Sequence, residues 1–388
     1  MTGPSVGRVS AGRVRVGFDG RALTSPAAGI RRYSRELFSA LNSLGAPIEL
    51  VMLGGTRSVV PDHVEWVREP AHPPTNAGWM IVGLPLAARR ARVEVLHAPA
   101  YTAPFWSPAP IVLTIHDVSY ARHPEWFPYR RDWLRRAFYR QSAMSASLVI
   151  TDSQFSAGEI QAAYGISQSQ IEVIPLGVVA AFTQTGNARI VLPTTVKVPF
   201  VLHVGDLHER RNLPMLMRAV LAARQRSAGC AGLSLVLAGV DRGVSAALHE
   251  LASADGMPDA VVTLGKVDDA TLRGLYGRAL ALVYPSLYEG FGLPVLEAMA
   301  AGLPVVAAQA ASIPEVLGDA GVLLDPHDES QWTEALTKLA ADKSWAAALS
   351  AAGRARAAAF TWERTARQTL AVYNRALGGR IQWGLASP

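Results

Sequence analysis

Residues 284–297 (YPSLYEGFGLPVLE) constrain the fold most, because an apolar run ends there in a glycine-rich loop that carries two carboxylates. The apolar residues 280–284 are followed by a proline and a serine, which predicts a short buried parallel strand. A helix should begin at Pro294 and end at Gly302, since proline suits the first helical turn and glycine suits the helix end. We therefore expect a strand, loop and helix that place Glu289 on an exposed turn.

The loop has the composition of an anion site. Gly290 and Gly292 allow close approach of the backbone to a ligand, and the amides near Phe291–Leu293 should point out of the first helical turn, where phosphate is favoured. Glu289 and Glu297 would repel a phosphate that they faced, so we expect them to face the hydroxyls of a sugar or ribose. The alternative from residues alone is an ordinary glycine turn flanked by two solvated surface acids.

The block EGFGLPVLEAMAAGLPVV resembles the signature of the retaining glycosyltransferases of family 4, also called group 1. These enzymes have the GT-B fold, an α/β architecture of two Rossmann-like, doubly wound domains facing each other across a cleft. The resemblance implies a sugar-nucleotide donor, with Glu289 on the transferred sugar, the loop amides on the diphosphate and Glu297 on the ribose. It also implies retention of anomeric configuration, no obligatory metal and no other cofactor.

Composition agrees with a two-domain α/β enzyme. The chain has 388 residues, half of them hydrophobic and 18% charged, and its single cysteine, Cys230, allows no internal disulfide. No apolar stretch is long enough for a signal peptide or a membrane span, so we expect a cytoplasmic protein. The net charge of +6 favours anionic partners, but no nucleic-acid motif is present, so nucleic acid is not an expected partner.

The first half of the chain alternates strands and helices, which predicts a parallel sheet covered on both faces. We expect strands at residues 13–18, 48–53, 93–97, 111–116 and 148–151. The loop at residues 19–30 should precede a helix, and the resemblance places it against the donor phosphate and the acceptor. Gly29 matches the family there, whereas Ala28 stands where a glycine is usual. Arg31 and Arg32 are interpreted as surface charges of the helix.

The fourth expected strand ends in His116 and Asp117, at the edge of the sheet where ligands of open α/β folds bind. From residues alone, His116 is either a structural histidine or a donor to a sugar hydroxyl. The sequence TIHD matches the family, whose histidine contacts the transferred sugar, and Asp117 should orient the loop.

Residues 123–140 (HPEWFPYRRDWLRRAFYR) interleave aromatic and basic side chains. One interpretation is a helix that rests on an anionic membrane, and the other is an aromatic stripe that packs on the sheet while arginines reach solvent. We assign residues 1–180 to an N-terminal acceptor domain and residues 181–198, which lack periodicity, to a linker.

A second alternating unit follows, and we assign residues 199–360 to a donor-binding domain and 361–388 to a C-terminal helix that crosses back. We expect strands at residues 199–205, 233–238, 261–264, 280–284, 304–308 and 322–326. The segment GDLHERRN resembles the family's basic loop, and it carries Gly205, Arg210 and Arg211, the last in place of a lysine. The two arginines should grip the diphosphate. By resemblance, Gly265, Val267 and Ser286 should border the base.

The expected reaction is transfer of a hexose to a hydroxyl of a glycan or glycolipid in polysaccharide or glycolipid assembly. Arg210, Arg211 and the loop amides should meet the charge on the leaving diphosphate, while His116 and Glu289 hold the sugar. GDP-mannose is favoured as donor over a UDP-hexose. A sugar-nucleotide epimerase of the same fold and a non-catalytic sugar-nucleotide-binding subunit remain alternatives. The sequence does not indicate the oligomeric state.

Overall fold

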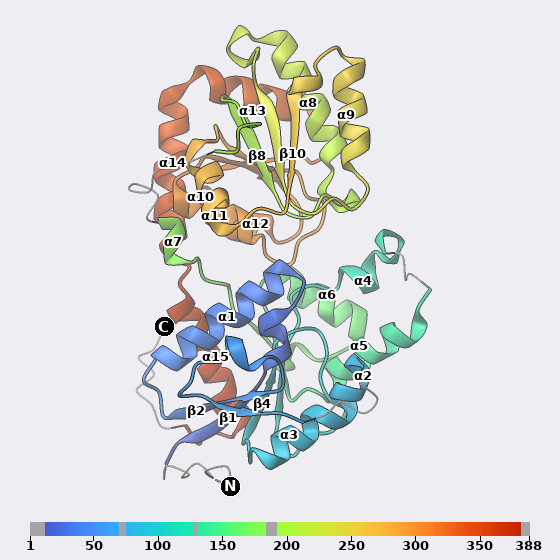
Figure 1. Cartoon of the computed structure of the whole chain (residues 1–388), viewed down its shortest axis with the longest axis vertical. Helices are drawn as coiled ribbons and strands as arrows, with labels where there is room; N and C mark the ends of the chain where they lie inside the picture. Colours follow the sequence, from blue (N-terminus) through green and yellow to red (C-terminus); the bar gives the residue numbers. More distant parts are fainter. Residues whose placement is uncertain (1–11, 70–74, 128–130, 184–191, 382–388) are drawn as a thin grey trace.

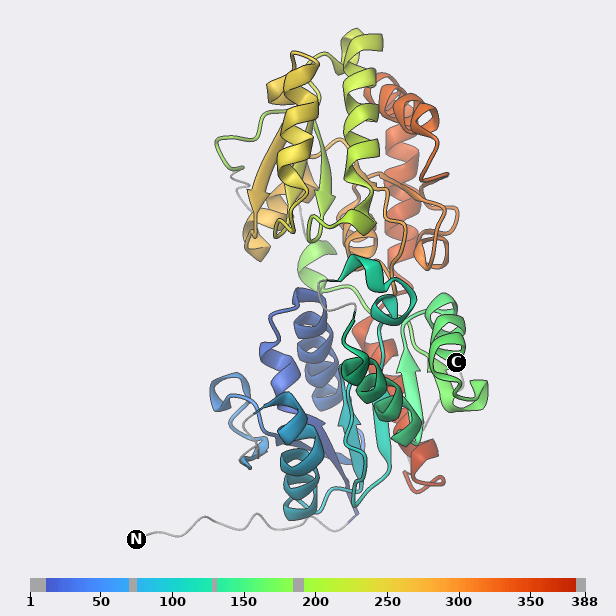
Figure 2. The same ribbon diagram turned by 90° about the vertical axis from the view of Figure 1, so that its right-hand side faces the viewer.

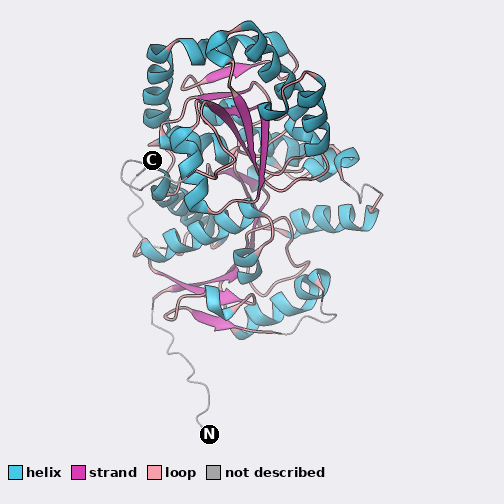
Figure 3. Ribbon diagram, turned by 45° about the horizontal axis from the view of Figure 1, so that its top comes forward, coloured by secondary structure: helices cyan, strands magenta, loops and turns pink. Residues whose placement is uncertain are grey.

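The computed structural model describes residues 12–69, 75–127, 131–183 and 192–381. The chain forms two stacked α/β units, each built on a sheet with helices on both faces, as Figures 1 and 3 show. The strand pairs recorded among the described residues are parallel. The prediction of two doubly wound parallel sheets is therefore confirmed.

The first unit contains a seven-stranded sheet. Its strands, in spatial order, are β3 (Glu65–Val67), β2 (Ile48–Leu53), β1 (Val14–Asp19), β4 (Val95–Ala98), β5 (Ile111–Thr114), β6 (Leu148–Thr151) and β7 (Ile171–Val173). Its helices are α1 (Ala28–Ser43), α2 (Asn76–Gly78), α3 (Leu84–Arg90), α4 (Ser119–Arg122), α5 (Trp133–Ser145) and α6 (Gln154–Tyr164). The two edge strands were not predicted, because each has three residues, one of them a glutamate.

The second unit contains a six-stranded sheet. Its strands, in spatial order, are β10 (Val261–Gly265), β9 (Ser234–Ala238), β8 (Phe200–Val204), β11 (Leu282–Tyr284), β12 (Val305–Ala308) and β13 (Val322–Leu324). The remaining helices are α7 (Ala180–Thr183), α8 (Leu213–Arg226), α9 (Ser245–Ala254), α10 (Asp269–Arg278), α11 (Leu293–Ala301), α12 (Ile313–Leu317), α13 (Glu329–Ala341), α14 (Lys343–Ala357) and α15 (Trp362–Ala376).

Apolar side chains cover both faces of each sheet. In the first unit, α1 and α15 pack on one face and α3, α5 and α6 on the other. In the second unit, α8, α9 and α13 cover one face, while α10 and α11 cover the face whose core continues into the first unit. The buried strands explain the uniformly apolar runs in the sequence.

Helix α15 returns to the first unit, as Figures 1 and 2 show. Thr361 caps its N-terminus by accepting a hydrogen bond from the amide of Arg364, and the Tyr373 hydroxyl lies 2.6 Å from Nδ1 of the buried His97. Helix α15 therefore lies against the first unit. Residues 382–388 lie outside the described part.

The expected extent of the N-terminal loop is corrected. Gly20–Thr24 form a 3₁₀ turn and α1 begins at Ala28, so the loop is shorter than residues 19–30. Gly29 lies in the first turn of α1, where glycine and alanine are tolerated because the amides need no helical partner. Gly29 is exposed, and a β-carbon there would meet no other atom within 4 Å. Among the described residues, no helix is long and apolar enough to cross a membrane.

Candidate functional site

The candidate site lies where the strand order of the second sheet reverses, between β8 and β11. The loop after β8 carries Arg210 and Arg211, and the loop after β11 carries Glu289. Ligands of open α/β sheets bind in the crevice outside such a reversal, because the flanking loops diverge to opposite faces. The topology thus brings together residues that lie far apart in the sequence.

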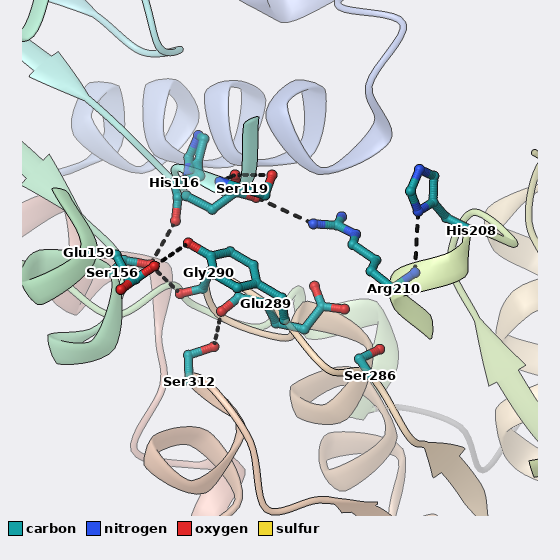
Figure 4. Close-up of polar contacts among 12 residues, drawn as sticks. His116, Ser119, Ser156, Glu159, His208, Arg210, Ser286, Glu289, Gly290 and Ser312 are labelled. Carbon is teal, nitrogen blue, oxygen red and sulfur yellow. Dashed lines mark hydrogen bonds and ion pairs between the residues drawn. The ribbon is translucent and has the colours of Figure 1, made fainter. Parts of the chain in front are cut away.

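Glu289 is buried, which corrects the expectation of an exposed turn. Its carboxylate forms an ion pair with Arg211 and accepts a hydrogen bond from the Tyr284 hydroxyl at 3.1 Å. Its carbonyl oxygen accepts a hydrogen bond from Ser312 Oγ at 2.9 Å, which fixes the loop from below (Figure 4). Burial and pairing also exclude the reading of Glu289 as a solvated surface charge.

Arg211 lies under the loop rather than in solvent. Its Nη1 donates hydrogen bonds to the Tyr284 hydroxyl at 2.7 Å and to Ser286 Oγ at 3.1 Å, in addition to the Glu289 ion pair. Gly205 adopts φ of +135°, and a β-carbon there would lie 3.2 Å from Nη2 of Arg211. Burial lowers the pKa of Arg211, and its contact with Tyr284 opposes that shift. Arg211 therefore neutralises and orients Glu289.

Arg210 points the other way, toward the first unit. Its guanidinium lies 3.7 Å from the carboxylate of Asp117, and its amide donates to Nδ1 of His208 at 3.3 Å (Figure 4). The Arg210 side chain keeps 22% of its surface exposed. Of the two predicted diphosphate ligands, Arg210 thus has the more exposed side chain.

The two glycines of the loop lie where the backbone is tightly constrained within the protein. Gly290 faces the backbone carbonyl of His116 so closely that a β-carbon would collide with it. The Gly290 carbonyl also accepts hydrogen bonds from Ser156 Oγ at 3.1 Å (Figure 4) and from Ser153 Oγ at 2.7 Å. Gly292 has φ of +102° and is the N-cap residue of α11, so the loop passes into the helix at Phe291–Leu293.

His116 follows β5 and its ring is largely buried. Nδ1 lies 2.7 Å from Oδ2 of the buried Asp152, while Nε2 has no hydrogen-bond partner among the described residues. Although burial of the ring lowers the pKa of His116, the charge of Asp152 raises it above its ordinary value. The ring points toward α1, where its centroid lies 4.6 Å from that of the Tyr33 ring (Figure 4).

Glu297 is buried in α11, just over one helical turn after the helix begins at Leu293. Its carboxylate pairs with Arg32 of α1 and accepts a hydrogen bond from the Tyr276 hydroxyl at 3.0 Å. Burial raises the pKa of Glu297, and the charge of Arg32 opposes that shift. Arg32 also lies 2.8 Å from Asp269, so the interpretation of Arg32 as a surface charge is wrong.

The predicted base-bordering residues lie on separate loops of the same sheet. Ser286 is buried next to Arg211, whereas Gly265 ends β10 and Val267 follows it, two strands from β8. Val267 is half-buried and packs on the core, and Gly265 has φ of +67°. Among the described residues, no group of three or more histidine, cysteine, aspartate or glutamate side chains is arranged to hold a metal ion.

A second carboxylate joins the two units beside the site. Glu315 of α12 accepts hydrogen bonds from the amides of Gln154 at 2.8 Å and Phe155 at 2.7 Å, the first two residues of α6. The sequence analysis missed this cap, Tyr276 and Asp152, and it did not foresee that Tyr284 contacts Glu289 and Arg211. The serine and acidic residues around α6 give a local capping signal in the sequence. No local pattern in the sequence indicates the partners that lie far away along the chain.

Two family descriptions match the chain: residues 27–182 match Glycosyltransferase Family 4, and residues 198–342 match Glycosyl transferases group 1. The O-antigen chain mannosyltransferase B of Escherichia coli is 30% identical over 271 residues, which cover 68% of this chain and 69% of that protein. A D-inositol 3-phosphate glycosyltransferase of Salinispora arenicola (strain CNS-205) is 32% identical over 257 residues. That match covers 61% of this chain and 56% of the relative.

A solved structure shares the architecture. HepE of Anabaena, in complex with UDP and glucose, has a TM-score of 0.68 at 18% sequence identity. The match covers 94% of this chain and all of that chain. At this identity the likeness concerns the fold of both units and their connection.

Proposed function

This chain belongs to the family 4, or group 1, glycosyltransferases and has the GT-B fold, and from that premise we propose that it transfers a hexose from a nucleotide diphosphate sugar to a hydroxyl of a glycan or glycolipid. The proposed transfer proceeds with retention of anomeric configuration. Mannose from GDP-mannose is the favoured donor sugar, since the Escherichia coli relative is a mannosyltransferase. A UDP-hexose is the second candidate.

The observation that carries the proposal is the pairing of both carboxylates with arginines around the strand-order reversal. Arg211 neutralises Glu289 and Arg32 neutralises Glu297, so neither carboxylate presents an uncompensated charge to a diphosphate. Arg210 and the first amides of α11 are left to attract the phosphates. A diphosphate between them would direct its sugar toward Glu289 and its ribose toward Glu297.

The proposed chemistry is electrostatic. As the bond to the sugar breaks, negative charge grows on the leaving diphosphate, and Arg210 with the helix amides stabilises that charge in place. Glu289, held by Arg211 and Tyr284, would accept hydrogen bonds from the hydroxyls of the reacting sugar. The leaving phosphate itself would take the proton of the acceptor hydroxyl.

A donor screen followed by turnover tests this function. We expect GDP-mannose and GDP to raise the melting temperature, and nucleoside diphosphate release with an acceptor to follow. Glu289→Gln serves as the control with impaired turnover. Change of the donor sugar without an acceptor would identify an epimerase, and binding without turnover would identify a binding subunit. Absence of a shift with every sugar nucleotide would refute the proposal.

We further propose that one face of the first unit rests on an anionic membrane, where a lipid-linked acceptor would be found. Trp133 and Leu134 at the start of α5 are 70% and 62% exposed, and Trp106 is 50% exposed. Exposed Arg131 and Arg140 border them, which suits anionic head groups. Part of the aromatic stripe packs inward as well, since the ring centroids of Phe138 and Phe105 lie 5.0 Å apart. Residues 128–130 of this segment lie outside the described part.

A further inference from the structure

Among the residues that the structure describes, Arg32 is the one residue of the first unit whose side chain forms an ion pair with Glu297. It lies on α1, and its guanidinium pairs with Glu297 of α11 and with Asp269, at the start of α10, at 2.8 Å. The guanidinium also stacks over the ring of Phe182 in α7, 5.4 Å from its centroid. Arg32 thus joins three segments around a buried carboxylate.

The partners of Glu297 are divided between its two oxygens. Arg32 takes Oε1, whereas the Tyr276 hydroxyl donates to Oε2. Tyr276 belongs to the same unit as Glu297, so within the part of the chain that the structure describes, Arg32 alone brings a polar contact from the other unit. The charge and orientation of Glu297 therefore depend on how the two units are placed.

We propose that Arg32 is a positioning residue for the nucleotide: it keeps Glu297 ionised and oriented for the ribose hydroxyls, so the nucleotide site of one unit is completed by a residue of the other. The inference rests on the proposed function for the identity of the ligand. A carboxylate accepts charge-assisted hydrogen bonds from hydroxyls, which a protonated carboxyl group does less well. Arg32 also screens the diphosphate from the negative charge of Glu297.

The neighbouring Arg31 provides a matched control. It lies on the same helix, and its Nη1 donates only locally, to the carbonyl of Ser25 at 2.5 Å and that of Pro26 at 3.5 Å. Arg31→Gln and Arg32→Gln remove the same charge from adjacent positions. Their comparison separates the general loss of a basic residue from the loss of the Glu297 contact.

The experiment measures GDP affinity of the full chain by calorimetry, with UDP as the second probe. We expect Arg32→Gln to weaken binding about 10-fold, the size of one charge-assisted hydrogen bond, while Arg31→Gln stays within about 2-fold of the wild type. Arg32→Gln combined with Glu297→Gln should bind no more weakly than Glu297→Gln alone. Equal affinities for the two arginine variants, or additive losses in the double variant, would overturn the inference.

A pH series gives a readout that a purely structural role would not move. The charged and titratable groups recorded around Glu297 are Arg32, Asp269 and Tyr276. Without Arg32, Glu297 should protonate at higher pH, so the fall in GDP affinity on acidification should begin at higher pH than in the wild type. An unshifted profile counts against the inference.

Failure of this inference can be distinguished from a variant that does not fold and from failure of the proposed function. Should Arg32→Gln fail to fold, Arg32→Lys keeps the charge but not the forked contact with Glu297 and Asp269, and we expect it to lose about 3-fold or more in GDP affinity. Wild-type affinity in Arg32→Lys would overturn the inference. If the wild type binds neither GDP nor UDP, the proposed function fails, whereas nucleotide binding that ignores Arg32 contradicts only this inference.

Discussion

Replacement of each buried carboxylate by its amide tests the division of labour between Glu289 and Glu297. Glu289→Gln and Glu297→Gln keep the side-chain size and remove one charge from an arginine–glutamate pair, with Arg211 and Arg32 as the partners left behind. Because both changes disrupt the same type of contact, differences between the kinetics of the two variants reflect where each carboxylate lies in the site rather than the kind of contact that is lost.

The structure predicts unequal costs in stability. Among the described residues, Arg211 has no recorded ion pair besides Glu289 and is buried, so Glu289→Gln should lower the free energy of unfolding by about 3 kcal/mol. Arg32 keeps Asp269 at 2.8 Å and is partly exposed, so Glu297→Gln should cost about 1 to 2 kcal/mol. Thermal denaturation of the two variants measures this order.

The functional effects should run differently. Glu289→Gln weakens a contact made to the reacting sugar, so kcat should fall by roughly 10²-fold, equivalent to about 3 kcal/mol, with little change in affinity for nucleoside diphosphate. Glu297→Gln acts on the ribose and should weaken nucleoside diphosphate binding by about 10-fold, whether or not a sugar is attached.

The assay combines calorimetry of the nucleoside diphosphate with kcat at saturating donor, both well below the melting temperature of the variants. If Glu289→Gln loses product affinity while Glu297→Gln does not, the two assignments are reversed. If neither variant changes turnover or affinity, the carboxylates serve only the stability of the fold, and the proposed mechanism loses its central residues.

Arg211→Lys should lower kcat and the melting temperature, because an ammonium cannot contact Glu289, Tyr284 and Ser286 as the guanidinium does; wild-type kinetics would contradict this. Asp152→Asn should remove stability that the raised pKa of His116 provides. That stability is complete below about pH 6.5 and is lost as pH rises through the raised pKa of His116. The difference in melting temperature between the wild type and Asp152→Asn should therefore narrow toward alkaline pH. Chelation should leave donor binding intact, since cationic groups and helix amides hold the phosphates; restoration by Mg²⁺ or Mn²⁺ alone would refute this. The wild type should sediment with anionic liposomes in a salt-sensitive manner; equal binding to neutral liposomes would exclude the electrostatic part.

Local sequence patterns predicted the strand and helix around the loop well, because their signals lie within a few residues of each other. The apolar run before the loop, Pro294 at the start of α11 and Gly302 at its end behave as expected, with Gly302 at φ of +73°. The burial of Glu289 and the reach of Arg32 were not predictable in the same way. Each depends on a partner brought near by topology, and neither periodicity nor capping residues encode such long-range pairs.

The contact of Gly290 with the His116 carbonyl matters for any hybrid built by joining halves of related enzymes. The loop that carries Glu289 fits against the first unit only because residue 290 has no side chain, and the hydroxyls of Ser153 and Ser156 then bind its carbonyl. A borrowed C-terminal half with a larger residue at this position would hold the two halves apart. Compatibility between exchanged halves therefore depends first on this contact between residue 290 and the His116 carbonyl, and only then on differences in donor or acceptor.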